Sequence, residues 1–233
     1  MTAPGTAAKE TRQYFAVSLF LMLATNRLIF PLGHFLGRFF PTRDLSLPAD
    51  ALFPFLTWTI AIYCGVFAWW LYIFWLTARR GRDEADRFFA ANLLGKAVCL
   101  AFFALLPTSA ARPAVSGNTI WDAAVRLLFA FDTPDNLFPS VHCFLGWLCY
   151  IVVRGKKDVP LRRRVLSLLL ALAVSLSTLT LRQHVLADVA GGILLAELCW
   201  ALCARPALRG RYGRLADRLC ALCFMRRNDS SRV

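Results

Sequence analysis

Residues 51–77 read ALFPFLTWTIAIYCGVFAWWLYIFWLT, a run of 27 positions without a charged side chain. About 20 consecutive apolar residues cross the hydrocarbon core of a bilayer as a helix, so this stretch predicts a membrane-spanning helix. The rest of the chain agrees, because 58% of its 233 residues are apolar and the mean hydropathy is +0.53. These values exclude a disordered or fibrous chain and argue against a soluble globular enzyme.

Five further apolar stretches complete the expected architecture, an all-α polytopic membrane protein with six transmembrane helices. No secretory signal peptide is expected, because the first apolar run begins late, is too long and lacks a small-residue cleavage site. A short turn around Arg182 separates the last two stretches and predicts an antiparallel hairpin. The predicted spans cover residues 14–37, 51–77, 88–106, 137–153, 165–181 and 185–204.

Lys and Arg residues are distributed unevenly between the loops. With a cytoplasmic N-terminus, the cytoplasmic segments hold 20 of them and the opposite side holds 5. The positive-inside rule then places both termini in the cytoplasm of a multi-pass protein of the inner (cytoplasmic) membrane. The net charge of +13 therefore indicates membrane orientation, and no nucleic-acid partner is expected.

Three segments are expected along the chain. They are a cytoplasmic N-terminal tail (1–13), a six-helix membrane domain (14–204) and a basic, amphipathic cytoplasmic C-terminal tail (205–233). The last segment is interpreted as a helix on the anionic inner leaflet, and the alternative is a tail with no membrane role. The long non-cytoplasmic loop at 107–136 is expected to contain a short interfacial helix from Ile120 to Phe129.

Eight cysteines predict neither a disulfide framework nor a metal site. Six lie inside apolar stretches, where a free Cys behaves as a small hydrophobe. Cys220 and Cys223 form a CxxC in the tail, and no His or Cys follows them. No metal and no cofactor is expected. Lys96 and Glu197 lie inside predicted spans at a similar depth, and they are expected to pair with each other.

Two of the three histidines stand at the non-cytoplasmic ends of predicted spans. In His184-Val-Leu-Ala-Asp188, the i, i+4 spacing places the imidazole and the carboxylate on one helix face. Asp188 would accept a hydrogen bond from one ring nitrogen of His184 and leave the other as a nucleophile. The alternative is a polar pair that satisfies itself within a helix bundle.

The segment Phe138-Pro-Ser-Val-His142 predicts an anion site at the start of a helix. Pro139 suits the first helical turn, which would place Ser140 and free backbone N–H groups at a helix N-terminus, where anions bind. His142 would there hand a proton to a leaving group. The alternative is an N-cap serine beside a buried histidine.

Two arginines extend the same constellation. Arg112 lies where the third span emerges and is able to clamp a phosphate, and Arg182 offers a second guanidinium. The alternative for Arg112 is an ordinary interfacial arginine. By the predicted topology, all these groups share one side of the membrane and a similar depth, which indicates a phosphoryl-transfer site that needs no metal.

These residues resemble the motifs of a known family, the type 2 phosphatidic acid phosphatase (PAP2) superfamily. Phe138–His142 is similar to its second motif, His184-xxx-Asp188 to its third, and Arg112-Pro113 to the end of its first. The resemblance covers roughly residues 50–205. It implies a PAP2-like, acid-phosphatase-like helical bundle with six spans and both termini inside.

The resemblance also implies roles for individual residues. His184 would attack phosphorus to form a phosphohistidine, and His142 would protonate the leaving oxygen. Asp188 would orient His184, while Arg112 and Ser140 would hold the phosphate.

The chain departs from the usual motifs at several positions. Leu105 stands where the family has a Lys, Thr178 where it has an Arg, and Val141 where Gly is common. Arg182 is expected to compensate for the missing Arg from the next turn. The pattern is closer to the branch that includes inositol phosphorylceramide synthases and related bacterial membrane proteins, so water and an alcohol both stay open as the final acceptor.

The resulting hypothesis is a membrane-embedded phosphatase that hydrolyses a lipid phosphate monoester or pyrophosphate. Its expected partners are the lipid substrate and the bilayer. One alternative is a lipid phosphotransferase that passes a phospho-headgroup to a lipid alcohol, and another is a non-enzymatic membrane transporter or scaffold. Because His142 must be protonated and His184 neutral, the enzymatic hypothesis predicts a bell-shaped pH–rate profile.

Overall fold

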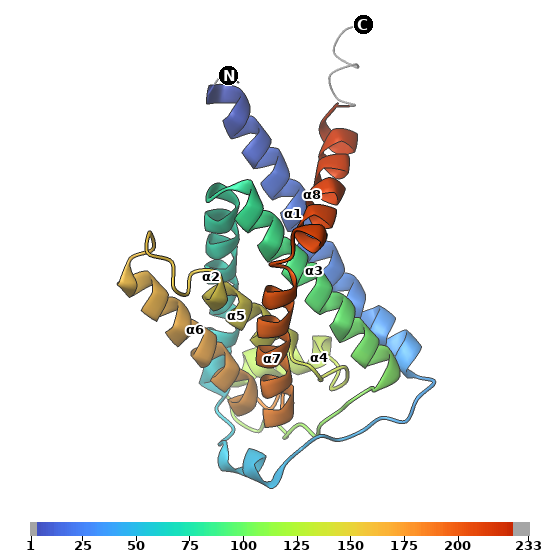
Figure 1. Ribbon diagram of the computed structural model, residues 1–233. Coiled ribbons are helices and arrows are strands. Elements are labelled where there is room, and N and C mark those ends of the chain that lie inside the picture. The colour runs from blue at the N-terminus through green and yellow to red at the C-terminus, as the bar shows by residue number, and fades with distance from the viewer. Residues whose placement is uncertain (1–3, 226–233) are drawn as a thin grey trace, which may run out of the picture.

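The computed structural model describes residues 4–225 as an all-helical protein, with no β-strand in that range (Figure 1). Short 3₁₀ turns cover Pro48–Leu52 (η1) and Thr57–Thr59 (η2), and a π-helical turn covers Ala221–Met225 (η3). The α-helices are α1 (Pro4–Gly37), α2 (Ile60–Arg79), α3 (Arg82–Leu105), α4 (Ile120–Phe131), α5 (Val141–Ile151), α6 (Leu161–Thr180), α7 (Leu186–Leu202) and α8 (Pro206–Cys220).

Four of the described helices are long and apolar enough to cross a membrane, namely α1, α2, α3 and α6. Helices α7 and α8 pass the same test only as a pair that bends by 91° at its break, which gives a fifth candidate. The all-α membrane architecture predicted from the sequence is confirmed. The predicted count of six spans is not confirmed, because α5 is a shorter apolar helix.

Helix α5 occupies the centre of the bundle. Its 11 residues reach about 16 Å at 1.5 Å per residue, roughly half of a 30 Å hydrocarbon core. It packs mainly against α6 and α7, and most of its side chains are buried, including Phe144, Leu148 and Cys149. The other helices therefore enclose this short helix.

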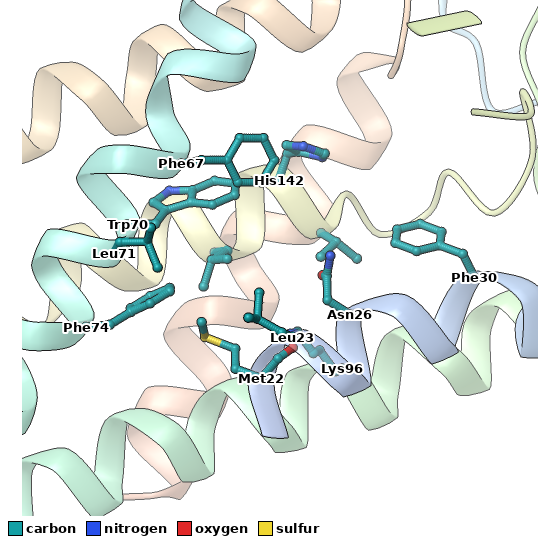
Figure 2. A pocket seen from close by; sticks show the side chains of 12 residues that line it. Met22, Leu23, Asn26, Phe30, Phe67, Trp70, Leu71, Phe74, Lys96 and His142 are labelled. Atoms are coloured by element: carbon teal, nitrogen blue, oxygen red, sulfur yellow. The ribbon is translucent and has the colours of Figure 1, made fainter. Parts of the chain in front are cut away.

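The two outer helices of the N-terminal half pack differently. Helix α1 lies against α3 along much of its length, whereas its contact with α2 is slight. The space between α1, α2, α3 and α5 forms an apolar pocket of about 150 Å³, with His142 at its edge (Figure 2). The pocket therefore extends from the start of α5 into the interior of the bundle.

One end of the bundle is tied together by ion pairs between its basic segments. Arg80 meets Asp158 at 2.7 Å, and Lys156 meets Glu84 at 2.8 Å. These contacts gather the α2–α3 turn and the α5–α6 loop at one end. The α3–α4 loop, the start of α5 and the α6–α7 turn lie at the opposite end (Figure 1).

The predicted tails are largely helical. Helix α1 starts at Pro4, inside the predicted tail 1–13. Helix α8 fills most of the predicted tail 205–233 and packs on α1 and α3, with Tyr212 and Ala216 buried. Residues 1–3 and 226–233 of these two tails lie outside the described residues. In the long loop, the expected short helix is present as α4.

Candidate active site

Ser140 begins α5 as its N-cap and is completely buried. Its hydroxyl oxygen accepts the amide hydrogen of Cys143 at 3.3 Å, which pairs one of the donors that a helix start leaves free. Pro139 was expected in the first turn but precedes the cap. Among the described residues, no hydrogen bond uses the amides of Val141 and His142, so α5 presents free N–H donors at its N-terminus.

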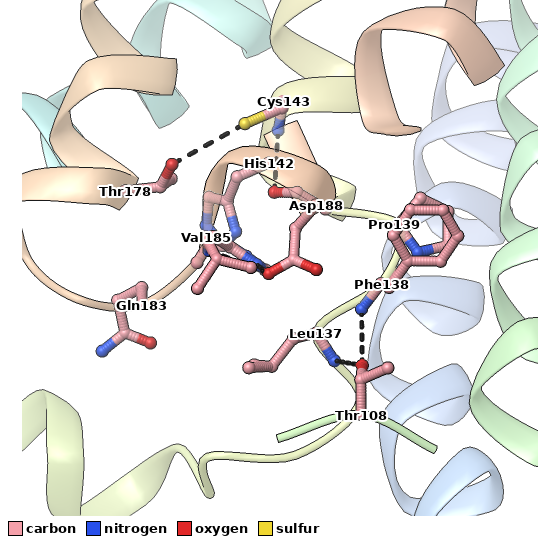
Figure 3. Close-up of polar contacts among 12 residues, drawn as sticks. Thr108, Leu137, Phe138, Pro139, His142, Cys143, Thr178, Gln183, Val185 and Asp188 are labelled. Atoms are coloured by element: carbon pink, nitrogen blue, oxygen red, sulfur yellow. Dashed lines mark hydrogen bonds and ion pairs between the residues drawn. The ribbon is translucent and has the colours of Figure 1, made fainter. Parts of the chain in front are cut away.

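The loop that leads into α5 is held by Thr108, which follows α3 (Figure 3). The Thr108 hydroxyl oxygen accepts the amide hydrogens of Leu137 at 3.1 Å and of Phe138 at 2.9 Å. Thr108 is itself buried. This contact attaches the segment after α3, which also carries Arg112, to the segment that positions His142.

The turn between α6 and α7 follows a Schellman pattern. The Gln183 amide donates to the Thr178 carbonyl at 2.9 Å, and the Arg182 amide donates to the Leu179 carbonyl at 3.1 Å. Arg182 adopts a left-handed backbone with φ of 55°, as the residue after a helix C-cap commonly does. The His184 amide also donates to Thr178, at 3.2 Å. The turn therefore sets His184 one residue before the N-cap of α7.

Asp188 connects this turn to the start of α7. One carboxylate oxygen, Oδ2, accepts the Val185 amide hydrogen at 3.0 Å and lies 3.3 Å from His184 Nδ1. Asp188 is completely buried in the first turn of α7, where the helix dipole stabilises a negative charge. The predicted contact between His184 and Asp188 is present, and Nε2 is the imidazole nitrogen left without this partner.

Helices α5 and α7 approach closely at their starts. The Ser140 amide donates to the Asp188 carbonyl at 3.0 Å. A Cβ at Gly192 would lie 2.5 Å from the Ser140 carbonyl oxygen, so only glycine permits this separation. As a result, the ring centroids of His142 and His184 are 6.5 Å apart.

His142 packs against aromatic side chains of α2. The ring of Tyr63 stacks on it with a centroid distance of 4.3 Å, and the Tyr63 hydroxyl lies 3.4 Å from His142 Nδ1. Trp70 and Phe67 flank the same imidazole (Figure 2). The phenol contacts Nδ1, which leaves Nε2 as the ring nitrogen without this partner.

Arg112 contacts Gln183 and Asp132 beside the two histidines. Its guanidinium donates to Gln183 Oε1 at 2.7 Å and to Asp132 Oδ2 at 2.9 Å, and also contacts the Asp132 carbonyl. Gln183 is 2% exposed. The guanidinium is thereby connected to His184 through the residue that precedes it.

A small cavity of about 30 Å³ lies at the centre of the site, and Arg112 is not among the residues that line it. Both histidines line it, and so does Gln183. The buried Gln183 Nε2 and Asn136 Oδ1 have no hydrogen-bond partner among the described residues. Buried polar atoms are nearly always paired, so these two atoms are available to a water molecule or to a polar ligand. The lining residues are Phe30, Tyr63, Asp132, Asp135, Asn136, Leu137, Val141, His142, Gln183 and His184.

Arg182 lies apart from the cavity. Its guanidinium donates to the carbonyl oxygens of Asp50 at 2.9 Å and Phe53 at 2.6 Å. Asp50 in turn accepts the Leu186 amide hydrogen at 2.7 Å. Arg182 therefore attaches the α6–α7 turn to the segment before α2, and its side chain does not line the cavity between the histidines.

The predicted pair between Lys96 and Glu197 is wrong. The Lys96 ammonium donates to the Met22 carbonyl of α1 at 2.7 Å. Glu197 instead binds Arg154 at 2.6 Å and accepts the Trp147 indole N–H at 2.9 Å. The two side chains face different sides of the bundle. A similar depth does not determine how each helix is rotated about its own axis, and so it does not predict which side chains meet.

Tyr63 and Gln183 were not predicted as site residues. Tyr63 belongs to the uncharged run 51–77, where nothing in the sequence distinguishes it from the other aromatic residues. Gln183 had a usable signal, since it is a polar residue directly before His184. Within residues 4–225, no group of three or more His, Cys, Asp or Glu side chains is arranged to hold a metal ion.

The fold and the site together define a polytopic helical membrane protein with a pair of imidazoles at the starts of two packed helices. A family model of the PAP2 superfamily matches residues 45–202, about two thirds of the chain, and the chain therefore belongs to that superfamily. Comparisons with curated proteins and with solved structures found no match. Members of the superfamily are generally phosphatases or phosphotransferases, which supports a phosphatase-type membrane protein.

Proposed function

We propose that this protein is an integral membrane lipid phosphatase that hydrolyses a lipid phosphate monoester or pyrophosphate through a phosphohistidine. One observation carries the proposal: His184 and His142 face a common cavity, and Asp188 contacts Nδ1 of His184. A carboxylate on one imidazole nitrogen fixes the tautomer that leaves the other nitrogen nucleophilic. A second imidazole nearby is positioned to serve as general acid.

The reaction runs in two steps. The lone pair of His184 Nε2 attacks phosphorus, and the bond from phosphorus to the lipid oxygen breaks. His142 gives its proton to that oxygen, so the lipid leaves as an alcohol, or as a monophosphate when the substrate is a pyrophosphate. Water then attacks phosphorus and gives a proton to His142 while the bond from phosphorus to His184 Nε2 breaks, which releases inorganic phosphate and restores both histidines.

The phosphate is held by groups that converge on the cavity. The unpaired Gln183 Nε2 donates from one side, and the free amides of Val141 and His142 donate from the start of α5. Arg112 does not line the cavity, and it supports the phosphate indirectly, because its guanidinium holds Gln183 through Oε1 and places a positive charge behind that residue. Fixed donors of this kind stabilise the charge that develops in a transition state. Ser140 acts as the cap that shapes this helix start. We assign Arg182 a positioning role, because its guanidinium is bound to backbone carbonyls.

The proposed topology has six crossings of the inner membrane, with α5 as a short enclosed span. Both termini lie in the cytoplasm and the site faces the extracytoplasmic side. Two observations support this orientation: the Lys and Arg bias of the loops, and the clustering of Arg80 and Lys156 at the end opposite the histidines. The proposed branch within the superfamily is the one that resembles inositol phosphorylceramide synthases.

The test is phosphate release from a panel of lipid phosphates and pyrophosphates by the purified protein in detergent. The wild-type protein is expected to release phosphate, and His184→Ala is expected to abolish release while remaining folded. The control is His34→Ala, because His34 contacts Asp135 and does not line the cavity. At short reaction times, an acid-labile phosphoryl group should accumulate on His184.

Other outcomes would contradict the proposal in recognisable ways. A new phosphodiester lipid without free phosphate would indicate the phosphotransferase. Full function of folded His184→Ala would indicate a transporter or scaffold. A flat pH–rate profile between about pH 5 and pH 8 would contradict the two-histidine scheme, since a general acid and a nucleophilic base in one cycle produce a bell-shaped dependence of rate on pH.

A further inference from the structure

The apolar pocket beneath the histidines reaches from His142 into the bundle (Figure 2). Helices α1, α2, α3 and α5 all contribute to its walls. Helix α1 lies outside the residues that match the family, so this wall belongs to the chain's own N-terminal segment. The lining residues are Met22, Leu23, Asn26, Phe30, Phe67, Trp70, Leu71, Phe74, Lys96, Val141, His142 and Leu145.

The rim of the pocket faces the side of the bundle. Leu23 of α1 is 53% exposed, and Phe67 and Leu71 of α2 are 45% and 46% exposed. All three side chains line the pocket as well. In a membrane helix, exposed apolar side chains at mid-span contact acyl chains, so the pocket opens between α1 and α2 toward lipid.

Lys96 forms an unusual part of this wall. It is 1% exposed, and its ammonium donates to the Met22 carbonyl at 2.7 Å and to the Thr25 hydroxyl at 3.4 Å. No carboxylate lies within ion-pair distance of it in the part of the chain that the structure describes. An ionisable side chain within a membrane bundle is costly and usually marks a functional site. Two neutral oxygens leave one of its three N–H donors unused.

The depth of Lys96 relative to the site follows from one contact. Cys99 lies three residues nearer the outer end of α3, and its sulfur is 4.0 Å from the Pro139 carbonyl at the start of α5. Lys96 is therefore about 4.5 Å, or nearly one helical turn, deeper than the phosphate-binding helix start. Asn26 of α1 lines the same pocket, and its side chain has no hydrogen bond among the described residues.

We propose that Lys96 and Asn26 form a polar subsite for the oxygen-bearing backbone of the lipid substrate. The recognised group is a carbonyl or hydroxyl that lies one helical turn deeper than the phosphate, as in a glycerol ester or a sphingoid amide. This inference rests on the proposed phosphatase function. A carbonyl oxygen there accepts the unused ammonium proton or the Asn26 amide hydrogen, and the chains extend along Leu71 and Phe74.

Lipids whose chain carries no further oxygen beyond the phosphate ester test whether this subsite exists. An isoprenyl or simple alkyl phosphate would place methylene groups against the Lys96 ammonium, which forms no hydrogen bond with them. The subsite therefore predicts a preference for diacylglycerol phosphate or ceramide phosphate over hexadecyl phosphate or an isoprenyl phosphate. The two oxygenated lipids also distinguish an ester from an amide as the recognised group.

The test compares KM for these four lipids in the wild type, Lys96→Met and Asn26→Leu. Both variants should raise KM for the oxygenated lipids roughly 10-fold, as expected for loss of one hydrogen bond to a charged or amide donor. KM for hexadecyl and isoprenyl phosphate should change less than about 2-fold. Thr25→Val is the matched control, because it removes a partner of Lys96 without altering the pocket lining.

Two results would overturn the subsite. One is a wild type whose KM does not differ between the lipids. The other is an equal rise in KM for all lipids in both Lys96→Met and Thr25→Val, which would indicate that Lys96 only ties α1 to α3. Binding of the same lipids to His184→Ala, measured by native mass spectrometry, separates this inference from the proposed function. Lys96-dependent binding without any hydrolysis by the wild type would retain the subsite and reject the phosphatase.

Discussion

The separation of the two histidines depends on Gly192, which provides a sharp test of the site. In the Gly192→Ala variant, the new Cβ would lie 2.5 Å from the Ser140 carbonyl oxygen and 3.0 Å from the Phe144 amide nitrogen. Both neighbours are backbone atoms, so no side-chain rotation relieves the clash. Ordinary contacts begin at 3.4 Å, so the start of α5 must move away from α7 by about 0.9 Å.

This displacement separates His142 from His184, because His142 lies two residues after Ser140, while His184 is held by Asp188 of α7. A misplacement of about 1 Å between reacting groups costs on the order of 100-fold in rate. We expect Gly192→Ala to lower kcat roughly 100-fold and to lower the free energy of unfolding by about 1–3 kcal/mol, as overpacking does. KM should change less than kcat, since the Gln183 donor is not displaced even though the Val141 and His142 amides move with α5.

The assay is phosphate release under saturating lipid, combined with thermal unfolding of the same preparation. Gly65→Ala is the matched control, because a Cβ at Gly65 of α2 meets nothing within 4 Å. That variant should keep full activity. Full activity of a folded Gly192→Ala protein would refute the reasoning, since it would mean that the spacing between α5 and α7 does not control the chemistry.

Three further predictions concern single side chains. Asp188→Asn should lower kcat by roughly 10²–10⁴-fold with little change in thermal stability, because an amide favours the wrong tautomer of His184; unchanged kcat would remove Asp188 from the mechanism. Gln183→Leu should raise KM roughly 10-fold in steady-state assays, since it removes the unpaired Nε2 donor from the cavity, and an unaltered KM would exclude that donor. Arg182→Met should lower the free energy of unfolding by about 1–3 kcal/mol, because the Asp50 and Phe53 carbonyls lose a charged donor; a large rise in KM with normal stability would instead indicate a phosphate ligand.

Local relationships in the site were predictable from spacing. The i, i+4 pair of His184 and Asp188 requires only a helical turn to meet, and the two residues do lie 3.3 Å apart. Ser140 was likewise predictable as a helix-start residue, because its hydroxyl bonds to an amide three residues away. The C-terminal ends of α3 and α6 and both ends of α7 followed from uncharged runs, since bilayer-spanning helices require continuous apolar sequence. Helices α3 and α6 start earlier than predicted, at Arg82 and Leu161, because their first turns are charged.

Relationships between helices were not predictable in the same way. Lys96 and Glu197 were expected at a similar depth, yet they bind Met22 and Arg154 respectively. Apolar positions surround a membrane helix on every side, so hydropathy does not report which face turns inward. The length of α5 was also overestimated, because uncharged residues continue on both sides of the helix and extend the run from which the span was predicted.

The sequence by itself determined an all-helical membrane chain, its charge asymmetry and the pairing of His184 with Asp188, because each depends on composition or on neighbours within one helical turn. Only the tertiary structure decided that Gln183, rather than Arg182, lines the cavity and binds Arg112. The left-handed backbone at Arg182 turns its side chain toward Asp50 and directs the next residue inward. Such a choice depends on the packing of segments more than 70 positions apart, which no local pattern encodes.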